Sequence, residues 1–403
     1  MLKTAFYEVR EKLLSCVKPL EKEEVYLDKC AGKVLAQDVV AKINVPPFNR
    51  SAYDGYAFCS EDTKNASKEC PVTLQILEEI PAGEIPHQKV TSGYAVKILT
   101  GAPIPEGADA VTKYEITQFT DTKVTIFDSF KSGSNIVRMG EDVKEGDVLV
   151  ECGTVIDAGV VGTLASQNIE SVLVYRIPKI AILSTGSELL NVGDELQFGK
   201  IYNSNQYVLC ATVEKLGCKP IVLGMEADNV NKISEQILKG LEECDIVILT
   251  GGVSVGDYDL TPKAMEMANI QILQHGVDLK PGMACAYGVK DGKLVCGLSG
   301  NPAASITNFH VIVAPLLRKL KGEKNYLPVE FSVKLLDSFS KKSPATRILR
   351  GKMEVLNGEI GIRIPKEQGN VVLSSTIGCD LMAIVPAGSG ALEKGTVLKG
   401  FFI

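Results

Sequence analysis

The chain has 403 residues, 45% of them hydrophobic, and its 43 lysines and arginines against 49 aspartates and glutamates give a net charge of −6. This length predicts two to four domains, since a domain takes about 150 residues. The mild negative charge argues against nonspecific binding to nucleic acid or to an anionic membrane, because both need a dominant basic field. An anionic small ligand needs only a local basic pocket and is not excluded.

The eleven cysteines are scattered and form no C-x-x-C pair, and the chain starts without a hydrophobic secretory segment. We therefore expect free thiols in a reducing compartment, and a cytoplasmic location. The longest apolar runs, such as "DIVILTGG", are far shorter than the ~18 residues of a membrane span. The three histidines, His87, His275 and His310, are too far apart in sequence for a zinc motif.

The first part of the chain predicts helices, followed by a β-rich insertion. "TAFYEVREKLLSCV" has the apolar spacing of an amphipathic helix, and a second helix is expected from Asp28 through "CAGKVLAQDVV". From Asn44 to Ser134, short β-rich runs alternate with Pro/Gly turns, which predicts an antiparallel β module. The segment that follows returns to mixed turns and a helix and can pack back on the N-terminal helices, so that the β module is an insertion.

From Ile180 onward, β and α patterns alternate regularly. Strand patterns such as "KIAILSTG" and "DIVILTGG" are followed by helical patterns, and "AASITNFHVIVAPLLRKLKG" closes the unit as a long helix. This alternation predicts a mostly parallel sheet with helices on both faces. The predicted fold class is multidomain α/β plus β: a central MogA-like α/β domain, an inserted β domain, an N-terminal mixed domain and a C-terminal β-barrel-like domain. The predicted boundaries are 1–44 plus 135–177 for the mixed domain, 45–134 for the insertion, 178–324 for the α/β domain and 325–403 for the C-terminal domain.

Two glycine turns follow buried strands of the α/β unit, "STGSELL" (184–190) and "TGGVSVGDYDL" (250–260). Both fall at carboxyl ends of parallel strands, the edge at which open α/β sheets bind ligands. Glu188, Asp257 and Asp259 would repel a phosphate there unless a hard cation such as Mg²⁺ lies between them. The alternative is ordinary turn chemistry, since neither segment has the Walker A or the G-x-G-x-x-G spacing.

Three further segments carry candidate binding groups. "SGNPAAS" (299–305) places Asn301 at the start of a helix, where backbone amides can bind an anion. "KPG" (280–282) supplies a lysine beside a proline turn, and its alternative is a solvated loop lysine. "PPFNRSAYDGYAF" (46–58) holds Asp54 on a rigid loop, where the alternative is that Asp54 only caps the turn at Gly55.

In their order along the chain, these segments resemble the molybdopterin molybdenumtransferase family, which includes MoeA and the E domain of gephyrin. The resemblance spans residues 25–376 and is carried by "PPFNRSAYDGYA", "ILTGAPIPEGADAV", "RMGEDVKEGDVL", "ILSTGSEL", "GKIYNSNQYVL", "VILTGGVSVGDYD", "KPG", "GNPAAS", and "ILRG" with "QGN" and "LSS". It implies Mg²⁺-dependent hydrolysis of adenylylated molybdopterin and insertion of molybdate into the dithiolene to give molybdenum cofactor. It also implies a four-domain homodimer with a cleft shared between subunits. A MogA-like adenylyltransferase and molybdoenzymes are possible further partners.

The resemblance also implies roles for individual residues, each matched by its motif. Glu188 and Asp259 match the acidic pair for Mg²⁺ and adenylate hydrolysis, with Asp257 beside them. The nucleotide-facing positions are Gly251, Gly252, Ser254, Tyr202, Asn203 and Asn205. The positions for molybdate or pterin phosphate are Lys280, Pro281, Asn301, Ser305, Arg350 and Ser375. The remaining polar cleft positions are Asp54, Thr100, Arg138, Asp142 and Asp228, of which the three aspartates are counted as catalytic.

The chain departs from the family pattern around its "KPG" segment. Gly276 and Met283 stand where the family usually has lysines, Ser299 replaces a proline, and Asn370 replaces a serine. Charge-assisted contacts contribute about 1.5–3 kcal/mol each, so the departures predict weaker oxyanion binding and a larger role for Lys280. They leave open a preference for tungstate, or a non-catalytic paralogue that acts as a pterin- or partner-binding scaffold. An adenylyltransferase like the related single-domain α/β proteins is a third alternative.

Overall fold

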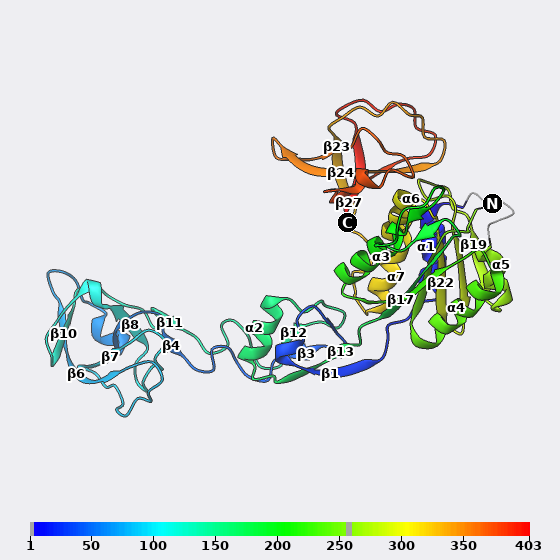
Figure 1. The fold of residues 1–403 in the computed structure, drawn as a ribbon. Helices are drawn as coiled ribbons and strands as arrows, with labels where there is room; N and C mark the ends of the chain where they lie inside the picture. The colour runs from blue at the N-terminus through cyan, green and yellow to red at the C-terminus, as the bar shows by residue number, and fades with distance from the viewer. Residues whose placement is uncertain (1–3, 255–259) are drawn as a thin grey trace. The chain divides into compact units, whose positions relative to one another are not determined.

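The chain forms two compact units in a computed structural model that describes residues 4–254 and 260–403. The first unit comprises residues 1–37, 152–158 and 171–403, and the second comprises residues 38–151 and 159–170. Each unit has its own hydrophobic cores, and Figure 1 shows the elements of both. None of the described helices is long and apolar enough to cross a membrane. None of the eleven cysteines, all of which lie within the described ranges, forms a disulfide, as predicted.

The first unit is centred on a six-stranded sheet of order β17-β14-β18-β22-β21-β19. Its first four strands are mutually parallel, and β21 and β19 extend it in antiparallel fashion. The strands are β14 (Lys179–Thr185), β17 (Lys219–Glu226), β18 (Ile246–Thr250), β19 (Gln271–His275), β21 (Ala286–Lys290) and β22 (Lys293–Leu298). The prediction of a mostly parallel sheet is confirmed.

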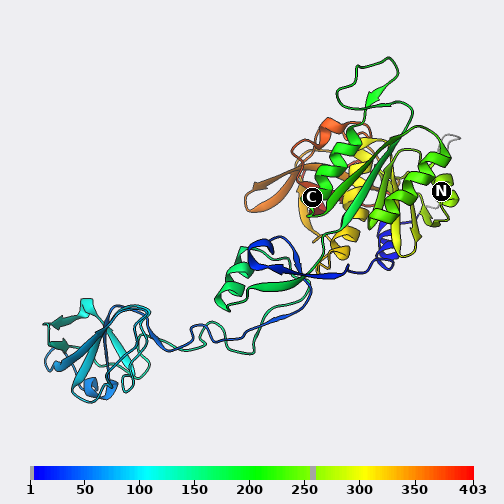
Figure 2. The same cartoon turned by 60° about the horizontal axis from the view of Figure 1, so that its bottom comes forward.

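Helices cover both faces of this sheet (Figures 1 and 2). Alternate side chains of β14 enter different cores, because successive residues of a strand point to opposite faces: Ile180 and Ile182 join one, Ala181 and Leu183 the other. The first face carries α1 (Phe6–Leu14), α3 (Ser204–Lys215), α6 (Pro302–Asn308), the π-helical η4 (Phe309–Val313) and α7 (Ala314–Leu320). The second face carries α4 (Val230–Glu243) and α5 (Thr261–Met267).

The C-terminal strands form a closed barrel, as the sequence predicted. They are β23 (Phe331–Leu335), β24 (Thr346–Leu356), β25 (Glu359–Arg363), β26 (Leu381–Val385) and β27 (Val397–Phe402). The order β24-β25-β23-β27-β26 returns on itself because β26 also pairs with β24. The short strand β20 (Leu279–Lys280) of the preceding domain adds to β24 in parallel, so that Lys280 is the register partner of Arg347. A short helix, η5 (Leu373–Thr376), also lies in this region.

The remaining elements of the first unit correct one prediction. No helix runs from Asp28; the chain forms the 3₁₀ turn η1 (Leu27–Lys29) and then the strand β2 (Val34–Leu35). Strands β1 (Lys22–Tyr26) and β2 flank β13 (Ser171–Tyr175) in an antiparallel sheet. A small pair is formed by β15 (Leu189–Leu190) and β16 (Ile201–Tyr202). Helix α1, which the sequence analysis grouped with the mixed domain, packs in the α/β core, while the other domain boundaries stay predictions.

The second unit contains a six-stranded sheet of order β8-β5-β7-β6-β10-β9, antiparallel except for the pair β6–β7. Its strands are β5 (Gly55–Phe58), β6 (Val72–Ile80), β7 (Tyr94–Ile98), β8 (Ala110–Lys113), β9 (Thr117–Phe119) and β10 (Lys123–Ile126). The smaller elements are η2 (Ser60–Thr63), η3 (Tyr114–Ile116), the pairs β3 (Val39–Val40) with β12 (Val148–Val150) and β4 (Arg50–Ser51) with β11 (Ile136–Val137), and helix α2 (Ala158–Ser166). Gly55 has no room for a side chain, because a Cβ there would lie 1.7 Å from the Thr112 carbonyl oxygen.

Candidate active site

The turn after β14 is held by a reciprocal pair of hydrogen bonds. The Ser187 amide donates to Asp228 Oδ2 at 3.1 Å, and the Asp228 amide donates to Ser187 Oγ at 3.2 Å. Asp228 therefore ties the segment after β17 to the glycine turn after β14, at the carboxyl edge of the sheet. The sequence analysis selected Asp228 but missed Ser187, which only its place in the "STGSEL" turn could have indicated.

Glu188 directs its carboxylate over the same turn. A Cβ built on Gly186 would lie 2.4 Å from Glu188 Oε2, so the carboxylate rests against the glycine backbone. Within residues 4–254 and 260–403, this carboxylate has no hydrogen-bond or ion-pair partner. Asp257 and Asp259 lie outside the described residues, so the predicted Glu188–Asp259 metal pair stays a prediction. Among the residues described, no three His, Cys, Asp or Glu side chains are grouped to hold a metal.

Gly251 brings the ends of three strands together. Its φ of +104° is in the region that favours glycine, and a Cβ would lie 2.4 Å from the Thr185 carbonyl oxygen. Its amide donates to the Leu298 carbonyl at 3.0 Å, and its Cα lies 3.5 Å from the Cβ position of Gly300. Asn205 Nδ2 completes the contact by donating to the Gly300 carbonyl at 2.7 Å. Gly251 and Asn205 thus both contact Gly300 at this edge of the sheet.

Two other predicted nucleotide-facing side chains make local structural contacts. Asn203 is buried, and its Oδ1 accepts from Ser184 Oγ at 3.1 Å and from the Gln206 amide at 3.3 Å, which caps α3. The Tyr202 hydroxyl donates to the Asp194 carbonyl at 2.9 Å. Gly252 accepts from the Thr261 amide, and Ser254 is exposed.

The turn of Lys280, Pro281 and Gly282 lies against helix α6. A Cβ on Gly282 would lie 3.1 Å from Asn308 Nδ2 and 3.3 Å from the Ala304 carbonyl oxygen, both on α6. Lys280 is exposed. Ser305, on the same helix between Ala304 and Asn308, is buried, and its Oγ has no hydrogen-bond partner among the described residues.

The start of α6 lies where the sequence predicted it. Asn301 occupies the N-cap position without a side-chain capping bond, and Pro302 opens the helix. Ser299, which the sequence analysis predicted to depart from the family pattern, accepts from the Asn301 amide through Oγ at 3.2 Å. This substitution therefore occupies one of the backbone donors predicted to bind an anion.

Arg350 is a buried guanidinium with unused donors. It is 0% exposed in β24, and its Nη2 donates to Ser375 Oγ at 2.9 Å and to the Gly369 carbonyl at 3.5 Å. Its Nε and Nη1 have no partner among the described residues. Burial lowers the pKa of Arg350. Gln368, which the sequence analysis missed, clamps the Arg350 backbone through both its side-chain atoms; its place before Gly369 in "QGN" was the available signal.

Helix α6 connects the Lys280 turn with the loop beside Arg350. The Ala303 amide donates to the Asn370 carbonyl at 3.1 Å, so the loop beside Arg350 is attached to the start of α6. Asn370 is one of the family departures, and it makes this contact through its backbone. Lys280, Ser305, Arg350 and Ser375, which were selected from separate motifs, are therefore held on elements in contact with one another: β20, α6, β24 and η5.

Four predicted cleft residues belong to the second unit. Asp54 Oδ1 accepts from the Thr100 amide at 2.7 Å and from Thr100 Oγ1 at 2.6 Å, and these bonds lower the pKa of Asp54. Asp54 thus holds the turn at Thr100, although the residue is exposed. Arg138 and Asp142 use their amides in the neighbouring loop, donating to Glu141 Oε2 and to the Val45 carbonyl.

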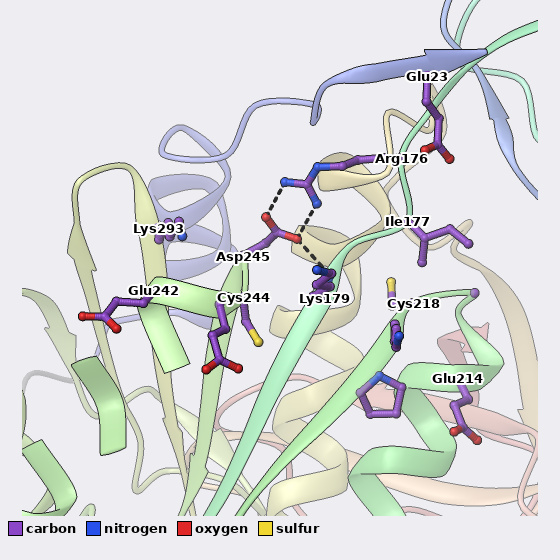
Figure 3. Close-up of a pocket in the computed structure, with 14 residues that line it drawn as sticks. Glu23, Arg176, Ile177, Lys179, Glu214, Cys218, Glu242, Cys244, Asp245 and Lys293 are labelled. Atoms are coloured by element: carbon purple, nitrogen blue, oxygen red, sulfur yellow. Dashed lines mark hydrogen bonds and ion pairs between the residues drawn. The ribbon is translucent and has the colours of Figure 1, made fainter. Parts of the chain in front are cut away.

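A separate cavity of about 680 Å³ lies at the opposite, amino-terminal edge of the parallel strands (Figure 3). Arg176 lies beside it and makes two hydrogen bonds of 2.7 and 2.8 Å to Asp245, which also accepts from the Lys179 amide. Burial alone would raise the pKa of Asp245, but the Arg176 bonds and the amide bond outweigh burial and lower it. Arg176 and Asp245 pair with each other here, and none of the residues selected from the sequence lines the cavity, so it is not our candidate site.

Comparison with known proteins agrees with this geometry. Residues 4–167 match the MoeA N-terminal region (domain I and II), and residues 181–319 match a domain described as a probable molybdopterin binding domain. A molybdopterin molybdenumtransferase of Staphylococcus epidermidis is 38% identical over 377 residues, which cover 93% of this chain and 89% of the relative. The chain belongs to the molybdopterin molybdenumtransferase family. Membership makes it an enzyme, a transferase of molybdenum cofactor biosynthesis.

Two further members of the family support the assignment. The molybdopterin molybdenumtransferase of Staphylococcus aureus strain Mu50 is 36% identical over 374 residues, 92% of this chain and 88% of its own length. The crystal structure of the molybdopterin biosynthesis moeA protein from Pyrococcus horikoshii OT3 superposes with a TM-score of 0.86 at 31% identity, covering 100% of both chains. The fold class predicted from the sequence is confirmed.

Proposed function

We propose that the chain hydrolyses adenylylated molybdopterin in the presence of Mg²⁺ and inserts molybdate into the dithiolene to give molybdenum cofactor. The observation that carries this proposal is the buried Arg350, whose Nε and Nη1 have no protein partner within the described ranges. A guanidinium left in this state is costly unless a ligand completes its hydrogen bonds. Nη1 shares one edge of the planar guanidinium with Nη2, so it can donate a charge-assisted hydrogen bond to a tetrahedral oxyanion beside the Ser375 contact.

Neighbouring groups support an oxyanion at this position. Ser375 Oγ is a buried hydroxyl bonded to Arg350. Ser305 Oγ is also buried, and it has no protein partner in the described part of the chain. Lys280 adds a second positive charge from the strand that pairs with β24. Two cations and hydroxyl donors match the double negative charge of molybdate or tungstate. Because the two anions share this chemistry, their competition has to be measured.

The carboxyl edge of the sheet supports the adenylate half of the reaction. The unpartnered Glu188 carboxylate, close to the Gly186 backbone, is a hard oxygen donor of the kind that Mg²⁺ prefers. Glu188 and Asp259 would hold the ion, which neutralises phosphate charge and polarises the bond to be cleaved. Asp228 fixes the turn that presents Glu188. Gly251 has no side chain, so the backbone of its turn, beside the Asn205–Gly300 contact, would lie close to the nucleotide.

In this proposal the second unit contributes polar side chains to the cleft, and Asp54 is the principal one. We propose a homodimer with a shared cleft, in which Asp54, Thr100, Arg138 and Asp142 meet the substrate of the partner subunit. Asp54 is preorganised by its two bonds to Thr100, so little freedom is lost on meeting a polar ligand. The four-domain division and the cytoplasmic location are parts of the same proposal.

One experiment tests the proposal and its alternative. Purified protein receives adenylylated molybdopterin, molybdate and MgCl₂, and AMP release and metal insertion are followed. We expect release that needs Mg²⁺ and falls at least tenfold in Glu188→Gln and in Asp259→Asn. The control is Glu195→Gln, a glutamate of the loop between β15 and β16 with no assigned role. Tight pterin binding without any AMP release would refute the proposed hydrolysis and favour the scaffold that the missing lysines suggest.

A further inference from the structure

Two buried side chains lie behind the turn that carries Lys280. Tyr287 in β21 and Asn308 at the end of α6 are each 0% exposed. The Tyr287 hydroxyl donates to Asn308 Oδ1 at 2.9 Å, and Asn308 Nδ2 donates to the Gly282 carbonyl at 2.7 Å. The result is a continuous chain of hydrogen bonds from the sheet, through the helix, to the backbone of the turn.

The chemistry of the partners fixes the direction of this chain. A backbone carbonyl only accepts, so the Asn308 atom that faces Gly282 must be the amide nitrogen. The amide oxygen then faces Tyr287, whose hydroxyl is the donor it needs. The buried Cys285 thiol also contacts the Tyr287 and Asn308 side chains, so these groups form a small network, and buried networks of this kind rigidify their surroundings.

The turn has a second attachment on its other side. Lys280 is in register with Arg347 of β24, while the Val277 amide donates to the Met283 carbonyl and closes the loop at 3.1 Å. The side chain of Lys280 is exposed and makes no hydrogen bond or ion pair with the described residues, so its Nζ depends on the backbone for its place. Gly276 and Met283 stand where flanking lysines are usual, so this single ammonium has no neighbouring cation in the loop to replace it.

We propose that Tyr287 and Asn308 are positioning residues that set the place of Lys280 and so determine the affinity for the oxyanion. This inference rests on the proposed function, because it assumes that Lys280 contacts the anion. A displacement of about 1 Å is enough to weaken a preorganised polar site substantially. Neither Tyr287 nor Asn308 is among the groups proposed above to bind the anion or the nucleotide, so their effect should be specific to the ligand that Lys280 contacts.

The test compares Tyr287→Phe and Asn308→Leu with the matched control Thr307→Val. Thr307 is equally buried on α6, but its hydroxyl bonds only to the Ala303 carbonyl of its own helix. Calorimetry measures the dissociation constants of molybdate and of AMP with Mg²⁺ for each protein. We expect Tyr287→Phe and Asn308→Leu to weaken molybdate binding about tenfold, the effect of one broken buried hydrogen bond. AMP binding should stay within about twofold, and Thr307→Val should change neither constant.

A double-variant cycle with Lys280→Met separates positioning from general loosening of the fold. If Tyr287 acts through Lys280, Tyr287→Phe has no further effect on molybdate binding once Lys280 is replaced. Additive losses, equal losses for both ligands, or wild-type affinity in Tyr287→Phe and Asn308→Leu would each overturn the positioning role. Wild-type protein that binds neither molybdate nor tungstate would instead refute the proposed function on which the role rests.

Discussion

Replacing Arg350 by methionine should separate stability from ligand binding. Methionine has a similar length and no polar hydrogens, so it fills the same buried space in β24. The change removes two buried nitrogens, Nε and Nη1, that have no partner among the described residues, each costing about 1–3 kcal/mol. It also removes the charge-assisted bond to Ser375, which contributes about 1.5–3 kcal/mol, and the longer 3.5 Å bond to Gly369, which contributes about 1 kcal/mol. Ser375 still donates to the Val372 carbonyl, so it is not left unpaired.

The expected balance is that Arg350→Met without ligand is as stable as the wild type or more stable by about 1–3 kcal/mol. The chain has no tryptophan, so urea unfolding is followed by far-UV circular dichroism and tyrosine fluorescence. Molybdate at one hundred times its dissociation constant should stabilise the wild type by about 2.7 kcal/mol and the variant not at all. A gain in stability together with a loss of binding identifies the guanidinium as a ligand group.

Arg347→Met is the matched control for this measurement. Arg347 is also buried in β24, but its Nε donates to Ser343 Oγ at 2.9 Å and its guanidinium lies 5.2 Å from the Phe339 ring centroid. Its loss should destabilise the protein by about 1–2 kcal/mol. If Arg350→Met destabilises the ligand-free protein as much as Arg347→Met does, Arg350 is a structural residue and our reasoning about its free donors is wrong.

Three further predictions follow from other parts of the molecule. Gly251→Ala should lower the free energy of unfolding of the first unit by about 2 kcal/mol or more, measured in thermal melts. The control is Gly224→Ala, which has nearly the same φ but nothing within 4 Å of its Cβ position, and which should lower the free energy of unfolding less. Equal losses in the two variants would show that strain in φ alone is responsible. Burial lowers the pKa of His310 from the usual 6.5 to about 4, so between these pH values the unfolded chain binds a proton that the folded protein does not, and the free energy of unfolding falls as the pH drops from 6.5 toward 4. His310→Asn should flatten this pH dependence of the urea midpoint. An unchanged slope in the variant would contradict the role of His310. Asp54→Asn keeps the oxygen that accepts from Thr100 but removes the negative charge. We expect a melting temperature within a few degrees of the wild type and a lower rate of AMP release. Full activity of the variant would show that Asp54 only holds the turn.

The sequence predicted the central domain well because its signals are local. The buried runs in β14 and β18 and the helices between strands are each set by the order of residues within a short segment. The helix predicted from Asp28 was wrong because distant partners decided that segment. Leu35 donates to the Thr154 carbonyl and Ala36 to the Leu173 carbonyl, so pairing with β13 and its surroundings prevailed over local preference.

The candidate site shows the same limit. Arg350 could be selected from the "ILRG" motif, but its complete burial and its unused nitrogens depend on packing in the closed barrel. Tyr287 and Asn308 carry no motif of their own, and their contact depends on how β21 meets α6. Asn203 caps α3, and its predicted contact with the nucleotide stays a prediction, because a cap position and a ligand position look alike in sequence.

The parallel pairing of β20 with β24 has a consequence for how this protein can be dissected. Lys280 comes from the α/β domain and Arg350 from the barrel, yet the ladder between Lys280 and Arg347 joins their backbones. A fragment that ends before residue 325 would lose both the guanidinium and the strand that supports the lysine turn. Isolated α/β domains of this chain should therefore keep the nucleotide edge while losing the oxyanion, which makes truncation a direct way to assign each ligand to its half of the molecule.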